Sequence, residues 1–163
     1  MDYNRVVKDL NGLTNDDFMA KLSEKFEISK EDGQVKPEKK AQFGMLLDGQ
    51  WYKLSAKKEI LSDDAVEGLD VSILQNEVLG PILGIGDPRT DKRIDFIGGI
   101  RGLGELEKRC NLDMKVAFSM HPTSISELFS VADDNRLMPP KSTWFEPKLL
   151  SGLFIHDICG TIN

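Results

Sequence analysis

The sequence predicts a single α+β domain in which helices pack on one mixed or antiparallel sheet. Strand-like and helix-like segments alternate irregularly along the 163 residues, and the chain has no internal repeat. Two strand segments, 43–47 and 51–54, flank the turn sequence Asp48-Gly49-Gln50, which is typical of a hairpin. These observations favour one sheet with at least one antiparallel pair of strands.

The first half of the chain is expected to contain two strands and one helix before the hairpin. Phe18, Leu22 and Phe26 recur every four residues, which is the spacing of one helical face. Residues 29–40 are polar and lack hydrophobic periodicity, so we expect a solvated loop there. The predicted order is a strand at 5–8, a turn at Asn11-Gly12, a helix that begins at Thr14 or Asn15, a strand at 26–28 and this loop.

The second half is expected to alternate helices and strands. Asp70 is a candidate N-cap for a helix that ends at Gly80-Pro81, and Ser124 forms a capping-box pattern with Glu127. We expect the strands to share one sheet with the hairpin, and the first and last of the helices to cover it. The predicted elements are helices near 70–79, 103–109 and 125–132 and strands near 94–97, 116–120 and 153–155.

Charge and cysteine content exclude several classes of protein. The 21 basic and 27 acidic residues give a net charge of −6, which does not favour nucleic acid as a partner. No signal-peptide pattern opens the chain and no apolar run could span a bilayer, so we expect a cytoplasmic protein without a membrane partner. Cys110 and Cys159 have no metal-binding or redox spacing. We therefore expect no metal site and no disulfide between them.

The arginines are distributed unevenly along the chain. Five of the six lie in the second half, and a guanidinium offers a planar fork of donors that suits carboxylate and phosphate. This asymmetry points to an anion site in the second half, with ordinary surface ion pairs as the alternative. The five are Arg89, Arg93, Arg101, Arg109 and Arg136.

Two glycine-containing segments in this half could carry such a site. Residues 84–93 form a turn-rich loop that includes Arg89 and charges of both signs. Residues 98–102 lie between a strand and a short helix, where backbone N–H groups can hold an anion and Arg101 could supply the counter-charge. An ordinary tight turn is the alternative for residues 98–102, because they do not match the dinucleotide fingerprint.

A third candidate segment, residues 121–124, lies between a strand and a helix. The hydroxyls of Thr123 and Ser124 could bind phosphate, and His121 could act as an acid or base. The alternative is that Ser124 is only an N-cap and His121 only the polar end of a strand.

The fourth candidate segment is the proline-rich stretch 138–148. Its Lys141-Ser142-Thr143 is similar to the end of a P-loop, but the required glycines are missing, so a P-loop is rejected. The prolines instead favour a rigid loop that presents Lys141, Ser142 and Thr143.

Several segments in this order resemble a known family. The chain resembles, from about Arg5 to His156, the C-terminal part of the conserved bacterial family catalogued as domain of unknown function 1015. The most specific motif is Met138-Pro139-Pro140-Lys141-Ser142-Thr143. The segments are 69–74, 80–85, 87–93, 96–102, 122–124, 138–148 and 150–154.

The resemblance implies that residues 1–163 are the C-terminal domain of a longer protein. Full-length members carry an upstream ParB-like half with an Asp-Gly-His-His-Arg motif, which this sequence lacks. The resemblance implies that the complete protein transfers a phosphoryl group to or from an amino acid such as serine. A nucleotide and magnesium would be its cofactors, with Asp87 and Asp91 as candidate metal ligands there. The domain alone is expected to be inactive.

The leading hypothesis is that this domain binds a small phosphorylated or anionic metabolite and contacts the upstream half of the same protein. We expect Arg89, Arg101, Lys141 and the hydroxyls of residues 123–124 and 142–143 to converge on one site, at the ends of parallel and adjacent strands. The alternative is a non-catalytic domain for partner binding or dimerisation, with Trp144 and Phe145 as interface anchors.

Overall fold

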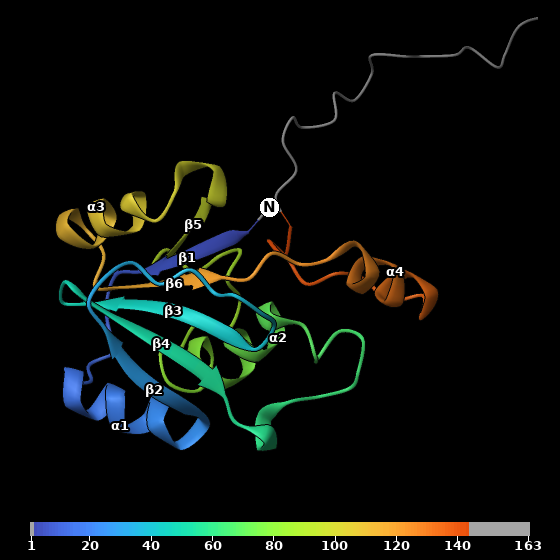
Figure 1. Cartoon of the computed structure of the whole chain (residues 1–163), viewed down its shortest axis with the longest axis horizontal. Coiled ribbons are helices and arrows are strands. Elements are labelled where there is room, and N and C mark those ends of the chain that lie inside the picture. Colours follow the sequence, from blue (N-terminus) through green and yellow to red (C-terminus); the bar gives the residue numbers. More distant parts are fainter. Residues whose placement is uncertain (1, 144–163) are drawn as a thin grey trace, which may run out of the picture.

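The computed structural model describes residues 2–143, which form one six-stranded sheet with helices on both of its faces (Figure 1). The order across the sheet is β2-β4-β3-β6-β1-β5, and all neighbouring strands are antiparallel. This confirms the α+β class and the predicted hairpin. The predicted strand near 153–155 lies outside the described residues. The strands are β1 (Tyr3–Val7), β2 (Phe26–Glu31), β3 (Gln42–Leu47), β4 (Gln50–Ala56), β5 (Ile94–Gly98) and β6 (Val116–Met120).

Strand β1 is the strand that positions the candidate site, because it lies between β5 and β6. It is antiparallel to both neighbours, so β5 and β6 run parallel to each other with β1 between them. Arg5 in β1 lies opposite Phe96 in β5 and opposite Phe118 in β6. All five residues of β1 are buried, as expected for an interior strand whose side chains alternate between two covered faces.

The helices begin and end close to the predicted positions. Helix α1 begins after the N-cap Thr14, whose hydroxyl accepts a hydrogen bond from the N–H of Asp17. Helix α4 begins after the predicted capping box of Ser124 and Glu127. No helix within residues 2–143 is both long and apolar enough to cross a membrane. The helices are α1 (Asn15–Lys25), α2 (Asp70–Leu74) with a π-helical continuation (Gln75–Leu79), α3 (Gly104–Leu112), α4 (Ile125–Asp133) and 3₁₀ turns at Lys58–Ile60 and Gly99–Arg101.

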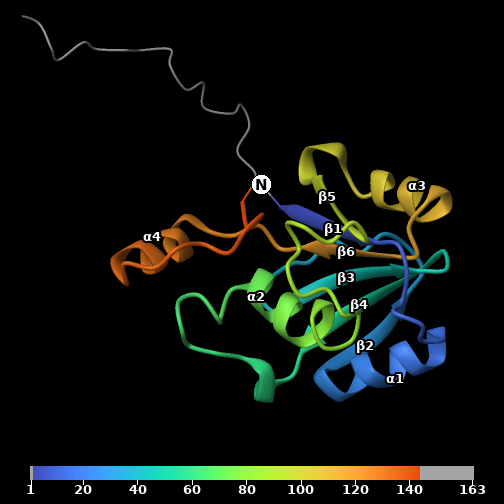
Figure 2. The same cartoon turned by 180° about the vertical axis from the view of Figure 1, so that it is seen from behind.

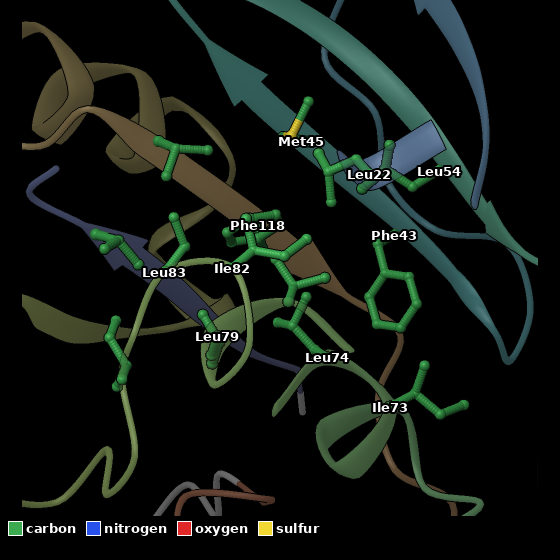
Figure 3. Close-up of a cluster of buried hydrophobic side chains, with 14 of the residues drawn as sticks. Leu22, Phe43, Met45, Leu54, Ile73, Leu74, Leu79, Ile82, Leu83 and Phe118 are labelled. Atoms are coloured by element: carbon green, nitrogen blue, oxygen red, sulfur yellow. The ribbon is translucent and has the colours of Figure 1, made fainter. Parts of the chain in front are cut away.

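The larger hydrophobic core lies between one face of the sheet and helices α1 and α2 (Figure 3). Phe43 from β3 and Phe118 from β6 are fully buried there, together with Leu22 from α1. Leu74 and Leu79 come from α2 and its π-helical continuation, and they lie beside Phe118 (Figure 3). This packing fixes α2 over the centre of the sheet, as predicted for the helix near 70–79.

A smaller core covers the opposite face of the sheet. Leu106 of α3 is fully buried there, beside Val6 of β1 and Trp51 of β4. The indole Nε1–H of Trp51 donates a hydrogen bond to the carboxylate of Glu107 at 2.9 Å. Helix α3 is therefore attached to the sheet by both apolar packing and a polar contact.

The prediction of a solvated loop over residues 29–40 is wrong in two respects. Strand β2 continues to Glu31, because it pairs with β4 at the edge of the sheet and its polar side chains face solvent. Val35 is only 8% exposed and packs into the smaller core. Its carbonyl accepts a hydrogen bond from Ser119 Oγ at 2.6 Å. Gly44 permits this close approach, since a Cβ there would overlap Ser119 Oγ and the Val35 carbonyl.

Asp70 does not cap the helix that begins beside it, so this part of the prediction is wrong. Leu69 occupies the N-cap position, and no side chain caps the helix. The carboxylate of Asp70 instead accepts a hydrogen bond from the N–H of Ala41 at 2.8 Å. The carboxylate of Asp70 therefore binds a residue that is distant in sequence, and not the N–H groups in the first turn of its own helix.

The prediction that the helix near 125–132 covers the sheet is also wrong. Figures 1 and 2 show α4 beyond the end of β6 and away from the other strands. Val131 is the buried residue of this helix, whereas Ile125 and Phe129 are 69% and 64% exposed. Helix α4 contributes Val131 to the larger core, but α1 and α2 cover the sheet there, so α4 lies at the side of the domain.

Candidate functional site

A cleft of about 480 Å³ lies on the face of the sheet that carries α2. One wall consists of Arg5 of β1 and Phe96 of β5, and the opposite wall consists of α2 and its π-helical continuation. Val66 and Glu67 just before α2, the loop at residues 86–89 and the pair Pro139-Pro140 complete the lining. Segments from the beginning, middle and end of the described chain thus meet around one space.

Arg5 is a charged residue within a buried strand. Residues opposite each other on antiparallel strands project from the same face of a sheet, so its side chain lies in a row with those of Phe96 and Phe118. The guanidinium carbon lies 5.6 Å from the centroid of the Phe96 ring, which is a cation–π distance. Arg5 is 3% exposed, and burial lowers its pKa to about 10. The guanidinium therefore remains charged at neutral pH.

The hydrogen-bond partners of this guanidinium are uncharged. Nη1 donates to the carbonyl oxygen of Tyr3, and Nη2 donates to that of Lys141 at 2.9 Å. Within residues 2–143, no carboxylate forms an ion pair with Arg5. A buried cation without a carboxylate costs free energy. An anion bound in the cleft would offset that cost.

Lys141 lies near the beginning of β1, and its side chain lies over two aromatic rings. Its ammonium lies 5.8 Å from the centroid of the Tyr3 ring and 5.7 Å from that of Phe96. The next residue, Ser142, is 6% exposed, and its carbonyl accepts a hydrogen bond from Thr123 Oγ1 at 3.1 Å. The structure therefore brings Lys141, Ser142 and Thr123 together, although 18 or more residues separate Thr123 from the other two. Thr143 is half-buried beside them.

Arg89 reaches the cleft from the loop at residues 86–89. Its guanidinium donates to the Asp87 carboxylate from Nε, at 3.0 and 3.3 Å from the two oxygens, and from Nη2 at 2.9 Å. These hydrogen bonds hold the pKa of Asp87 below its usual value. Arg89 is 66% exposed at its side chain, so its pairing with Asp87 lies at the open rim of the cleft.

The α2 side of the cleft supplies amide groups and a second carboxylate. Gln75 Nε2 donates to the carbonyl of Ile85 at 2.8 Å, and Asn76 Nδ2 donates to the Glu67 carboxylate at 2.6 Å. The π-helical geometry that contains Gln75 and Asn76 is a feature that recurs at functional sites. The cleft therefore contains two cations, Arg5 and Arg89, and two carboxylates that already have partners.

Among the eight predicted site residues, Arg89 lines the cleft. The other seven do not: Arg101, His121, Thr123, Ser124, Lys141, Ser142 and Thr143. Arg101 has a side chain that is 66% exposed, and its guanidinium is 3.9 Å from Glu105. Ser124 is occupied by its capping box, since its N–H donates to the Glu127 carboxylate at 2.8 Å. His121 is half-buried just after β6 and is not among the residues that line the cleft.

The strands before residues 98–102 and 121–124 were expected to be parallel and adjacent. They are parallel, but they are not adjacent. Strands β5 and β6 are parallel, so the segments at 98–102 and 121–124 follow them at the same end of the sheet. They are not adjacent, because β1 lies between them. The beginning of β1 and residues 139–142 occupy the space in which the two segments were expected to meet.

The candidate magnesium ligands Asp87 and Asp91 each have an arginine partner. Asp91 pairs with Arg93 at 2.8 Å, and Arg93 also donates to the carbonyl of Leu83 at 3.0 Å. Within the part of the chain that the structure describes, no group of three or more His, Cys, Asp or Glu residues could hold a metal ion. The two carboxylates therefore stabilise the loop at 84–93 rather than form a cluster.

The thiol of Cys110 lies outside the cleft, on α3. It is free and half-buried, and burial raises its pKa to about 11. Cys159 lies outside the described residues, so the expected absence of a disulfide between the two stays a prediction.

Sequence reasoning missed Arg5, the most deeply buried cation of the cleft. The available signal was an arginine directly before Val6 and Val7, which together place apolar side chains on both faces of the strand. An arginine in such a strand must be buried unless the strand lies at an edge. The sequence does not show whether β1 is an edge strand, because its neighbours β5 and β6 come about 90 and 110 residues later.

The fold and the cleft define a single-sheet α+β domain with a buried arginine at its candidate binding site. The family model described as "Protein of unknown function (DUF1015)" matches residues 1–72, and this match supports membership of the chain in that family. The matched residues include Arg5 and the first residues of α2, whereas the π-helical continuation and residues 138–143 lie beyond them. No curated protein and no solved structure matches the chain.

Proposed function

We propose that this domain binds a small anionic or phosphorylated metabolite, with the anionic group against the guanidinium of Arg5. The observation that carries the proposal is the burial of this guanidinium at the cleft without a carboxylate partner in residues 2–143. Charge-assisted hydrogen bonds to a carboxylate or phosphate would use its free donor capacity. Arg89 at the rim would attract the anion and contact its outer side.

The finer part of the proposal concerns the reaction of the complete protein. We propose phosphoryl transfer to or from an amino acid such as serine, in the cytoplasm and together with the upstream half of the family protein. The mixed charges of the cleft support such a ligand. A phosphorylated amino acid carries an anionic group suited to Arg5 and an ammonium suited to Glu67 or Asp87.

The proposal is tested by titrating inorganic phosphate and phosphoserine into the protein by isothermal calorimetry. Replacing Arg5 by methionine (Arg5→Met) should weaken binding at least tenfold, about 1.4 kcal/mol, because hydrogen bonds to charged groups contribute about 1.5–3 kcal/mol. Arg89→Met, at the exposed rim where it cannot disturb the core, should also weaken binding. The matched control is Arg101→Met, which removes an exposed guanidinium outside the cleft.

Circular dichroism would verify that each variant is folded. Equal binding by the unsubstituted protein and both cleft variants would overturn the proposal. An equal loss in the Arg101→Met variant would do so as well, because it would locate the anion elsewhere.

One observation favours a second candidate function, dimerisation. Ile125 and Phe129 of α4 are four residues apart, so they share one face of the helix, and both are largely exposed. Leu137, shortly after the helix, is 90% exposed. The occupant that we propose for this face is a second copy of the chain, because a two-fold pairing of α4 with itself would bury the same residues from both sides.

A further inference from the structure

Residues 139–142 run from the lining of the cleft to the beginning of β1, and we call this segment the strap. Pro139 and Pro140 form part of the cleft lining. The hydroxyl of Ser142 donates to the carbonyl of Pro139, and the carbonyl of Ser142 accepts from Thr123 Oγ1 at 3.1 Å. The strap is therefore a compact turn that is attached at its end to the segment after β6.

Lys141 holds the strap against the sheet. Its ammonium lies over both Tyr3 and Phe96, at 5.8 and 5.7 Å from the ring centroids. Its backbone has a φ of 58°, a left-handed conformation that is uncommon for a residue with a side chain. Contacts of the side chain and the carbonyl must maintain this conformation, so the strap position depends on Lys141.

The strap occupies one of the five N–H groups of the Arg5 guanidinium. Nη2 of Arg5 donates to the carbonyl of Lys141 at 2.9 Å, and Nη1 is already engaged by the carbonyl of Tyr3. A phosphate that binds a guanidinium with two oxygens uses N–H groups on two neighbouring nitrogens. It would therefore compete with the Lys141 carbonyl for the N–H groups of Nη2. Because a phosphate oxygen is charged and a carbonyl is not, the anion is the stronger acceptor of the two.

We propose that the strap is an autoinhibitory contact, in which the Lys141 carbonyl occupies an N–H of Arg5 Nη2 until an anion displaces it. This inference rests on the proposed function, since it concerns the regulation of the same site. Binding of the anion through two nitrogens of Arg5 then requires the open form of the strap. The apparent affinity is the intrinsic affinity multiplied by the fraction of molecules in which the strap is open.

This inference reverses the role that the sequence suggested for Lys141. If Lys141 were a ligand of the anion, its removal would weaken binding. If it closes the strap, its removal frees Arg5 and tightens binding. Whether removal of the Lys141 side chain weakens or tightens anion binding therefore distinguishes the two roles.

The test measures inorganic phosphate binding by calorimetry in the full chain and in two strap variants. Lys141→Ala removes the cation–π contacts and leaves the backbone, and we expect binding about fivefold tighter. Thr123→Val removes the hydrogen bond to the Ser142 carbonyl at constant shape and should act in the same direction. Lys21→Ala on the exposed face of α1 loses the same charge far from the strap and should leave binding unchanged.

The outcomes for the strap and for the site are distinguishable. Binding that depends on Arg5 but is weakened or unchanged by Lys141→Ala overturns the strap proposal and leaves the proposed function intact. Binding that is measurable only in the strap variants supports the strap proposal. An absence of binding in the unsubstituted protein and in both strap variants overturns the two proposals together.

Discussion

Arg5 and Asp70 are the charged side chains that are buried among residues 2–143, and they differ in what compensates their burial. The guanidinium of Arg5 has two carbonyl partners and an aromatic ring. The carboxyl of Asp70 has the N–H of Ala41 and the more distant charge of Lys40, opposed by that of Glu127. Burial raises the pKa of Asp70 to about 6, from an ordinary value of 3.8.

The pKa of Asp70 predicts how stability depends on pH. Its folded-state pKa lies above the unfolded value, so its contribution to stability is present below pH 3.8 and is lost as the pH rises through 6. Asp70→Asn keeps the acceptor for the Ala41 N–H and removes the charge. This variant should be about 2–3 kcal/mol more stable than the parent at pH 8, with the difference vanishing below pH 4.

Urea denaturation at several pH values would measure this difference. Asp63→Asn, a substitution of an exposed carboxylate in the same loop region, is the control and should show no such pH dependence. A pH-independent effect of Asp70→Asn would contradict the assigned burial of the charge.

At the scale of single elements, local signals identified most helices and strands. Thr14 and Ser124 cap helices through their own side chains, which depends only on residues three positions away. Strand β2 was predicted too short because it is an edge strand. Its residues 29–31 are polar, so they show no hydrophobic pattern. They belong to the strand because their backbone pairs with β4.

Gly44 shows how the packing of one element constrains the sequence of another. Gly44→Ala would place a Cβ against Ser119 Oγ and the Val35 carbonyl, so it should destabilise the fold by about 1–3 kcal/mol. Gly33→Ala, close to Val35 but with no atom within 4 Å of the added Cβ, should change stability by about 0.5 kcal/mol or less. Urea denaturation of both variants would check the contrast, and equal effects would contradict the packing.

At the scale of the whole molecule, the exposed apolar face of α4 predicts a concentration-dependent dimer. Sedimentation of the unsubstituted protein should show association, and Phe129→Asp should shift the protein to monomer because a buried unpaired carboxylate is costly. Leu112→Asp is the matched control, since Leu112 is 77% exposed at the end of α3. A protein that stays monomeric at all concentrations, or a dimer that survives Phe129→Asp, would reject dimerisation through this face.

The assembly of the cleft is also a property of the whole molecule. Arg89 and Lys141 were recognisable in the sequence because charged residues beside glycine or proline are conspicuous there. Arg89 lines the cleft and Lys141 lies beside it over Phe96, whereas Arg101, with the same local features, lies outside the lining with an exposed side chain. Local pattern does not distinguish these residues, since only the strand order decides which loops lie beside α2.

The sequence by itself determined the α+β class, the hairpin, the capped helices α1 and α4, and the positions of most strands. These features depend on side-chain periodicity, turn residues and caps, all of which act within a few residues along the chain. The tertiary structure alone decided that β1 lies between β5 and β6, that Arg5 is buried at a cleft, and that Lys141 lies over Tyr3 and Phe96. Such contacts join residues roughly 45 to 140 positions apart, and their free energy depends on burial that no local pattern specifies.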